Sequence, residues 1–97
     1  MATYISLLSL TEQGIKTIKD LSGRIAAGRQ AMEAAGGKLV QYYLTLGAQD
    51  AVVVFELPDD ETAASLVLAQ AGLGNLRSTT CLLYTSDAAD DTPCVDL

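Results

Sequence analysis

The chain has 97 residues, 49% hydrophobic and 19% charged, with twelve acidic against six basic side chains and a formal net charge of −6. This length suits one domain, and the composition is that of a folded protein rather than a disordered one. An acidic balance with scattered basic residues and few aromatics argues against nucleic-acid binding. No apolar run approaches the ~20 residues of a membrane span, and no secretory signal is expected. We therefore expect a cytoplasmic protein with neither a nucleic-acid nor a membrane partner.

The composition changes towards the C-terminal end. All six basic residues lie within residues 1–80, whereas four of the twelve acidic residues and both cysteines lie beyond residue 80. Cys81 and Cys94 are too close to one end to make a disulfide framework, and they do not form a Cys-x-x-Cys motif. The sequence contains no histidine, the commonest metal ligand and general base. We expect no metal site and no cofactor.

The first predicted elements are a strand and a helix. Residues 3–10 are apolar or β-branched over the length of a strand. A polar stretch containing glycine follows, and then the hydrophobic period changes. Apolar or small residues at 18, 21, 25, 28, 32 and 35 step by three or four, as on one face of a helix. Ser22 could cap a second segment, so a break near 20–22 is expected. Gly36 and Gly37 should end the helix, since glycine accepts the left-handed conformation.

A hairpin, a second helix and a last strand are predicted next. Residues 38–45 and 51–56 form two strands around a turn at Gly47. Pro58, Asp59 and Asp60 are typical of a helix N-terminus, so a helix is predicted over 62–71. Glycines at 72 and 74 should end it, and residues from 75 to about 84 are predicted as a strand.

The predicted order is β-α-β-β-α-β, an α+β ferredoxin-like fold with a four-stranded antiparallel sheet and two helices on one face. The strands are apolar on both faces, so the face without helices should be covered as well. Tyr4, Tyr42 or Tyr43, and several valines at 52–54, are candidates for that face. A homodimer through the open sheet face is therefore expected.

Several motifs in the same order resemble the GYD domain family of short prokaryotic proteins. They are Thr3-Tyr4-Ile5-Ser6-Leu7, Thr11-Glu12-Gln13-Gly14-Ile15-Lys16, Tyr43-Leu44-Thr45-Leu46-Gly47, Pro58-Asp59-Asp60 and Gly74-Asn75-Leu76-Arg77. The resemblance covers residues 3 to about 80. It implies a ferredoxin-like fold related to the dimeric α/β-barrel proteins and implies no particular reaction. The Gly-x-Tyr-Asp motif that names the family stands here as Gly47-Ala48-Gln49-Asp50, so Gln49 replaces the tyrosine.

The C-terminal segment resembles something else. Residues 81–97 are similar to translated sequencing adapter, a peptide found at the ends of unrelated metagenomic reading frames. A natural acidic, disordered C-terminus is the alternative that the charge distribution allows. We therefore predict a domain over residues 1–85 and a non-native or disordered tail over 86–97.

Three polar residues beside predicted turns are candidate ligand-binding residues. Asp50 could act as a polar anchor or base, or its carboxylate could hold the turn through backbone N–H groups. Arg77 could bind a carboxylate or phosphate, or form an ion pair with Glu56 or Asp50. Asn75 could join Arg77 at a ligand, or stop the preceding helix in the left-handed conformation.

Tyr4, Tyr42 and Tyr43 supply hydroxyls that could line a cavity between sheet and helices or between subunits; plain packing is the alternative. Of these, Tyr4 and Tyr43 are the remaining candidate ligand-binding residues. With these residues, we expect a homodimeric small-molecule-binding module. A protein-interaction or structural module is the alternative, as is a cofactor-free enzyme working with Asp50, Arg77 and the tyrosines.

Overall fold

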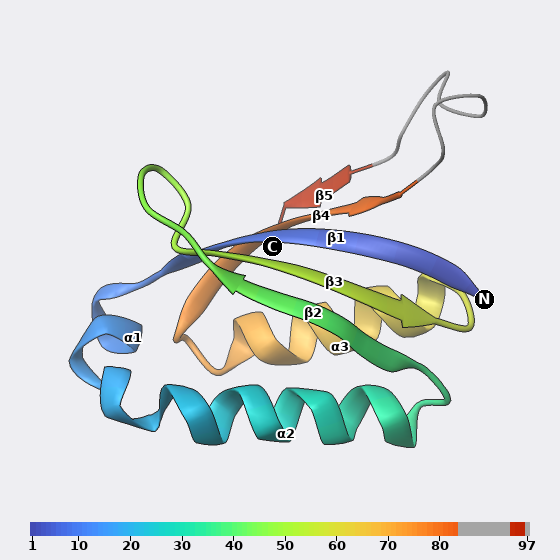
Figure 1. Ribbon diagram of the computed structural model, residues 1–97, viewed down its shortest axis with the longest axis horizontal. Helices are drawn as coiled ribbons and strands as arrows, with labels where there is room; N and C mark the ends of the chain where they lie inside the picture. The colour runs from blue at the N-terminus through green and yellow to red at the C-terminus, as the bar shows by residue number, and fades with distance from the viewer. Residues whose placement is uncertain (84–93, 97) are drawn as a thin grey trace.

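The computed structural model describes residues 1–83 and 94–96, which form one sheet and one layer of helices (Figure 1). In chain order the elements are β1 (Ala2–Leu10), α1 (Glu12–Lys16), the 3-10 helix η1 (Ile18–Asp20), α2 (Leu21–Ala34), β2 (Lys38–Leu44), β3 (Ala51–Leu57), α3 (Asp60–Gly72), β4 (Leu76–Leu82) and β5 (Cys94–Asp96). None of the helices among the described residues is long and apolar enough to cross a membrane.

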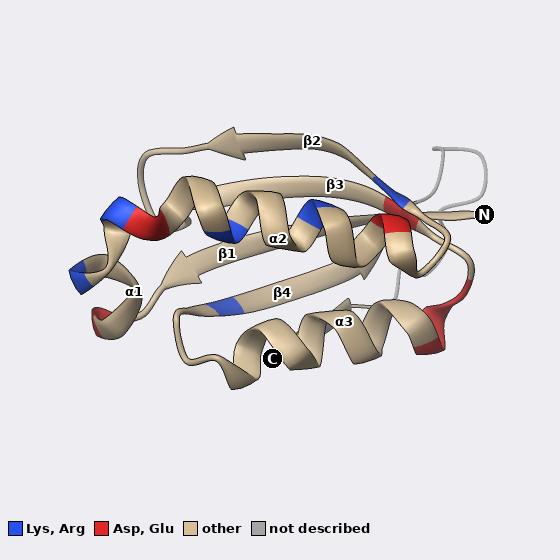
Figure 2. Cartoon of the chain, turned by 90° about the horizontal axis from the view of Figure 1, so that it is seen from below, with Lys and Arg blue, Asp and Glu red and all other residues tan. Residues whose placement is uncertain are grey.

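The strand order β2-β3-β1-β4 is that of a ferredoxin-like sheet, and every pairing in it is antiparallel. Both long helices lie on the same face, α2 towards β2 and α3 towards β4, as Figure 2 shows from the helix side. The predicted α+β class, element order and one-sided helix layer are confirmed. The opposite face carries no element in the described part of the chain.

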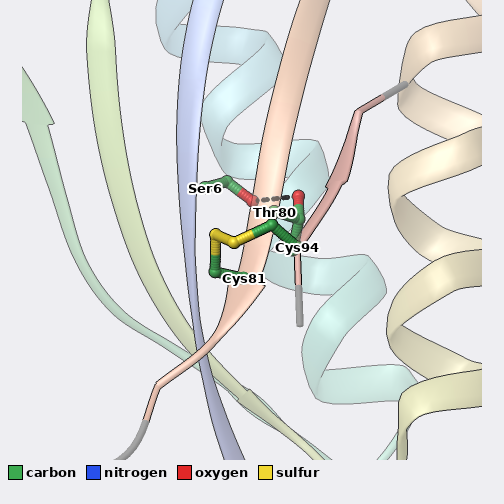
Figure 3. The surroundings of a disulfide bond; sticks show 4 residues. All are labelled: Ser6, Thr80, Cys81 and Cys94. Carbon is green, nitrogen blue, oxygen red and sulfur yellow. Dashed lines mark hydrogen bonds between the residues drawn. A yellow bond between two sulfur atoms is a disulfide. The ribbon is translucent and has the colours of Figure 1, made fainter. Parts of the chain in front are cut away.

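A fifth strand extends the predicted four-stranded sheet. β5 pairs antiparallel with β4, with Cys94 opposite Cys81, and the two cysteines form a disulfide (Figure 3). The sequence did not predict this pairing, because it depends on the chain returning alongside β4. Most of the segment 86–97 predicted as a tail lies outside the described residues. The domain boundary at residue 85 therefore stays a prediction.

The helical segment between β1 and β2 is broken at residues 20–21, as predicted, and has a further break at Thr17. α1 ends at Lys16, and η1 then turns the chain into α2, which begins at Leu21. Ser22 lies inside α2, so its predicted role as a cap is wrong; Asp20 occupies the N-cap position without a side-chain cap bond. The predicted glycine stop is confirmed, since Gly36 adopts a positive φ of 89° directly after the helix.

The core lies between the sheet and the helices and is built around Tyr4, Val53, Phe55, Leu57 and Ala63. The rings of Tyr4 and Phe55 stack with centroids 5.5 Å apart. Successive residues of a strand point to opposite faces, so Val52 and Val54 face the open side while Val53 faces the helices.

The same alternation determines on which face of the sheet each tyrosine lies. Tyr4 is 4% exposed in the core, so its predicted place on the open face was wrong. Of the two alternatives Tyr42 and Tyr43, half-buried Tyr42 packs against the core. Tyr43 is 53% exposed and occupies the open side.

The predicted start of the second helix is confirmed. The Asp59 carboxylate accepts a hydrogen bond of 2.8 Å from the backbone N–H of Thr62, and Asp60 begins α3. This bond lowers the pKa of Asp59 below its usual value.

Candidate functional site

A cavity of about 380 Å³ lies between the sheet and the helix layer. α2 contributes Leu21, Arg24 and Ile25, among others, and the sheet contributes residues from β1 to β4. The lining is predominantly apolar, with a few polar side chains at separate points: Ser6, Arg24, Arg29, Tyr42, Thr45, Asp50, Gln70, Asn75 and Ser78. An apolar hollow with a few polar groups is the usual character of a small-molecule site.

Several hydroxyl groups lie on the sheet face that is covered by the helices. Ser6 of β1 and Thr80 of β4 stand opposite each other and share a hydrogen bond of 2.6 Å (Figure 3). Ser78 lines the cavity at 5% exposure, and its Oγ atom has no hydrogen-bond partner among the described residues. Such a group is costly to bury, so Ser78 is a candidate contact for a molecule in the cavity.

Asp50 lines the cavity and also ties the hairpin turn to β1. Its Oδ2 accepts a hydrogen bond of 2.7 Å from the N–H of Leu10, and its own N–H donates to the Leu8 carbonyl over 2.8 Å. The neighbouring Gln49 accepts a bond of 3.1 Å from the Ser9 hydroxyl. The Asp50 carboxylate is thus bound to a backbone N–H, in the neighbouring strand rather than in its own turn.

Asn75 lines the cavity at a corner where two family motifs meet. Its backbone carbonyl accepts from Thr11 N–H over 3.1 Å, and its side chain accepts from Gln13 over 3.0 Å. The Thr11 hydroxyl also donates to the Gly74 carbonyl over 2.5 Å. Gly74, with φ of 81°, adopts the left-handed conformation that was considered for Asn75 from the sequence. The threonine and glycine motifs therefore join the start of α1 to the start of β4.

The other three predicted site residues do not line the cavity. Tyr4 lies in the core, where its hydroxyl donates to Asp60 over 2.6 Å. Tyr43 and Arg77 are exposed on the open side of the sheet, and Arg77 has no ion pair with Glu56 or Asp50 within 4.0 Å. The predicted set is thus split between two faces of the sheet, and the residues named for a cofactor-free enzyme are not brought together.

The polar cavity residues that the sequence did not single out as a site include Arg24 and Ser78. Arg24 lies among small residues on α2 and carries no motif. The sequence had offered Tyr42 for the sheet face, for a cavity lining or for packing, and the structure places it in the cavity lining. Burial raises the pKa of its phenol, and the positive charge of Arg24 acts in the opposite direction. The alternation of Arg77, Ser78 and Thr79 along β4 was the available signal for a buried hydroxyl at 78.

No group of three or more His, Cys, Asp or Glu side chains that could hold a metal ion occurs within residues 1–83 and 94–96. The cavity polar groups are hydroxyls, amides and isolated charges. They suit hydrogen bonding and charge pairing with an organic molecule better than metal coordination.

Comparison with known proteins identifies the family. The model of the GYD domain matches residues 4–92 of this chain. The chain belongs to the GYD domain family. The family match extends past residue 80, where the resemblance seen in the sequence stopped, and it includes part of the predicted tail.

One curated relative of this GYD domain comes from Thermus thermophilus and is named "Glutamine synthetase and cystathionine beta-lyase binding protein". The two chains are 35% identical over 81 residues, which cover 82% of this chain and 85% of the relative. No solved structure matches the chain.

Proposed function

We propose that this GYD domain is a protein-binding module that acts on metabolic enzymes in a prokaryotic cytoplasm. The observation that carries the proposal is the name of the Thermus thermophilus relative, which describes binding to glutamine synthetase and cystathionine β-lyase. Similarity along most of both chains supports the same kind of activity here. We therefore favour the protein-interaction module over the small-molecule-binding module that the sequence analysis placed first.

The sheet face opposite the helices is the proposed binding surface. We call it the open face, and its apolar residues include Ile5 and Leu7 of β1, Val52 and Val54 of β3, and Tyr43 of the edge strand β2. All five are at least partly exposed, and no element of the described chain covers them. Lys38, Glu56 and Arg77 lie around them on the same side. An apolar centre with a charged rim is the usual layout of a protein interface.

The test is binding of the purified chain to the glutamine synthetase and the cystathionine β-lyase of Thermus thermophilus, measured by biolayer interferometry. The Thermus thermophilus relative serves as the positive control. We expect saturable binding to at least one of the two enzymes. If the relative binds and this chain binds neither enzyme, the proposed function is contradicted.

A pair of variants locates the surface. Tyr43→Asp places a charge among the apolar residues of the open face, and Leu68→Asp places the same charge on α3, at positions 53% and 60% exposed in the native chain. We expect Tyr43→Asp to weaken binding by about tenfold or more, since tyrosines are enriched among the residues that dominate interfaces. Leu68→Asp should bind as the native chain does. The reverse result would place the interface on the helix side.

Small-molecule binding is the second candidate function, and the cavity favours it. The volume of about 380 Å³ lies within the usual range of ligand sites, and the lining combines apolar walls with Asp50, Asn75 and the unpartnered Ser78. A metabolite screen by thermal shift tests this function. A ligand at 100 times its dissociation constant should stabilise the protein by about 2.7 kcal/mol.

A further inference from the structure

The positive and negative residues that line the cavity do not balance. Its charged lining residues are Arg24 and Arg29, both from α2, and Asp50 at the hairpin turn. Two arginines against one aspartate leave a net positive charge in a predominantly apolar wall. An apolar site with surplus positive charge favours a molecule that combines an apolar body with a negative group.

Arg24 is the better placed of the two arginines. It is half-buried, whereas Arg29 is exposed. Its guanidinium donates to the Thr17 hydroxyl over 2.9 Å and to the Gly14 carbonyl over 3.4 Å. Both acceptors are neutral, and no carboxylate in the described part of the chain lies within 4.0 Å of it. A guanidinium has five N–H donors, so donors and an unbalanced charge remain for a ligand.

Asp50 does not supply the missing negative charge. Its carboxylate is held by the backbone N–H of Leu10 at 2.7 Å and forms no ion pair with Arg24 or Arg29. The Tyr42 phenol, which also lines the cavity, is close enough for the Arg24 charge to act on its ionisation. Arg24 of α2 and Tyr42 of β2 both line the cavity.

We propose that this cavity binds an apolar carboxylic acid, with the carboxylate at Arg24 and the apolar body between α2 and the sheet. The inference rests on the small-molecule function proposed above and is independent of enzyme binding at the open face. The guanidinium fork matches the two oxygens of a carboxylate. At roughly 30 Å³ for each water-sized group, the volume of about 380 Å³ accommodates a medium-chain or single-ring acid.

The test compares octanoate with 1-octanol, which share the apolar chain and differ in charge. Dissociation constants are measured by isothermal titration calorimetry with the full chain at neutral pH. We expect octanoate to bind about tenfold or more tightly than octanol, the lower range for a hydrogen bond to a charged group. In Arg24→Gln this preference should disappear.

Lys19→Gln is the matched control, because it removes the same charge from η1, outside the cavity. It should keep the preference for octanoate. If Arg24→Gln also keeps it, the assignment to Arg24 is overturned. If the native chain binds both probes equally, the carboxylate inference fails while the small-molecule function stands. If neither probe binds at millimolar concentration, this inference fails, and the metabolite screen described above decides the small-molecule function separately.

Discussion

Three buried hydroxyl groups on the helix-covered face of the sheet differ in their hydrogen bonding. Ser6 and Thr80 satisfy each other across β1 and β4 at 2.6 Å, whereas Ser78, two residues away on the same face of β4, has no partner in the described structure. All three side chains are at most 9% exposed. Because a buried hydroxyl contributes to stability only when it is bonded, these serines should respond oppositely to substitution.

Ser6→Ala should lower the free energy of unfolding by about 1–3 kcal/mol, because it leaves the Thr80 hydroxyl buried without a partner. Ser78→Ala should leave this free energy unchanged or raise it by up to about 1 kcal/mol. Urea unfolding of the two variants measures the difference. An equal loss in both would mean that a molecule in the cavity already satisfies Ser78.

Asp59 makes the start of α3 sensitive to pH. Its pKa is lowered in the folded chain, so it binds a proton more weakly there than in the unfolded chain, where the pKa is about 3.9. The cap should therefore stabilise the fold fully above about pH 4 and lose this contribution as the pH falls through the lowered folded value. Asp59→Asn keeps an acceptor at the cap and should lack this part of the pH dependence. Thermal unfolding between pH 2 and 7 compares the two; identical curves would rule out the effect.

At the scale of elements, close backbone contacts determine how the helices join the sheet. A side chain at Gly14 in α1 would place its Cβ 2.0 Å from the carbonyl oxygen of Asn75, just before β4. The same corner holds the hydrogen bond from the Thr11 hydroxyl to the Gly74 carbonyl. The family motifs at 11–16 and 74–77 therefore join two segments that are distant in sequence.

Gly14→Ala should destabilise the fold by about 1–3 kcal/mol or more, because backbone must move to admit the methyl group. Gly23→Ala is the matched control, since nothing lies within 4 Å of the new atom in α2. It should stabilise the protein by about 0.5–1 kcal/mol through helix propensity. Urea denaturation gives both values. A neutral Gly14→Ala would disprove the close contact.

The short strand β5 lies beyond the predicted domain boundary at residue 85. β4 keeps seven register pairs with β1 and only three with β5, so most of its pairing does not depend on the C-terminal segment. With reductant present, truncation after Ser86 should change the free energy of unfolding by less than about 0.5 kcal/mol. The reduced full chain is the reference, so that loss of the Cys81–Cys94 disulfide does not enter the comparison. A loss of several kcal/mol would place the segment within the fold.

At the scale of the whole molecule, the one-sided helix layer leaves the open face available to a single occupant at a time. Without a partner enzyme, we expect a second copy to cover it, giving a homodimer in light scattering at micromolar concentration. Tyr43→Asp should shift the chain to monomers, and Leu68→Asp should not. A partner enzyme that uses the open face should compete with the second copy and dissociate the dimer. A native chain that stays monomeric at high concentration would contradict the dimer.

The local pattern of residues determined the element order, the hairpin, the glycine ends and the Asp59 cap, because each depends on neighbours in the chain. The family motifs could likewise be recognised in the sequence, although the contacts that join Thr11, Gly14 and Asn75 could not be predicted from it. Tertiary structure alone decided which face each strand residue occupies, since a shift of one position inverts it. It therefore separated Tyr4 from Tyr43 and brought Arg24 and Ser78 to one cavity. It also placed Cys94 opposite Cys81, since strand pairing joins residues whose distance along the chain carries no local signal.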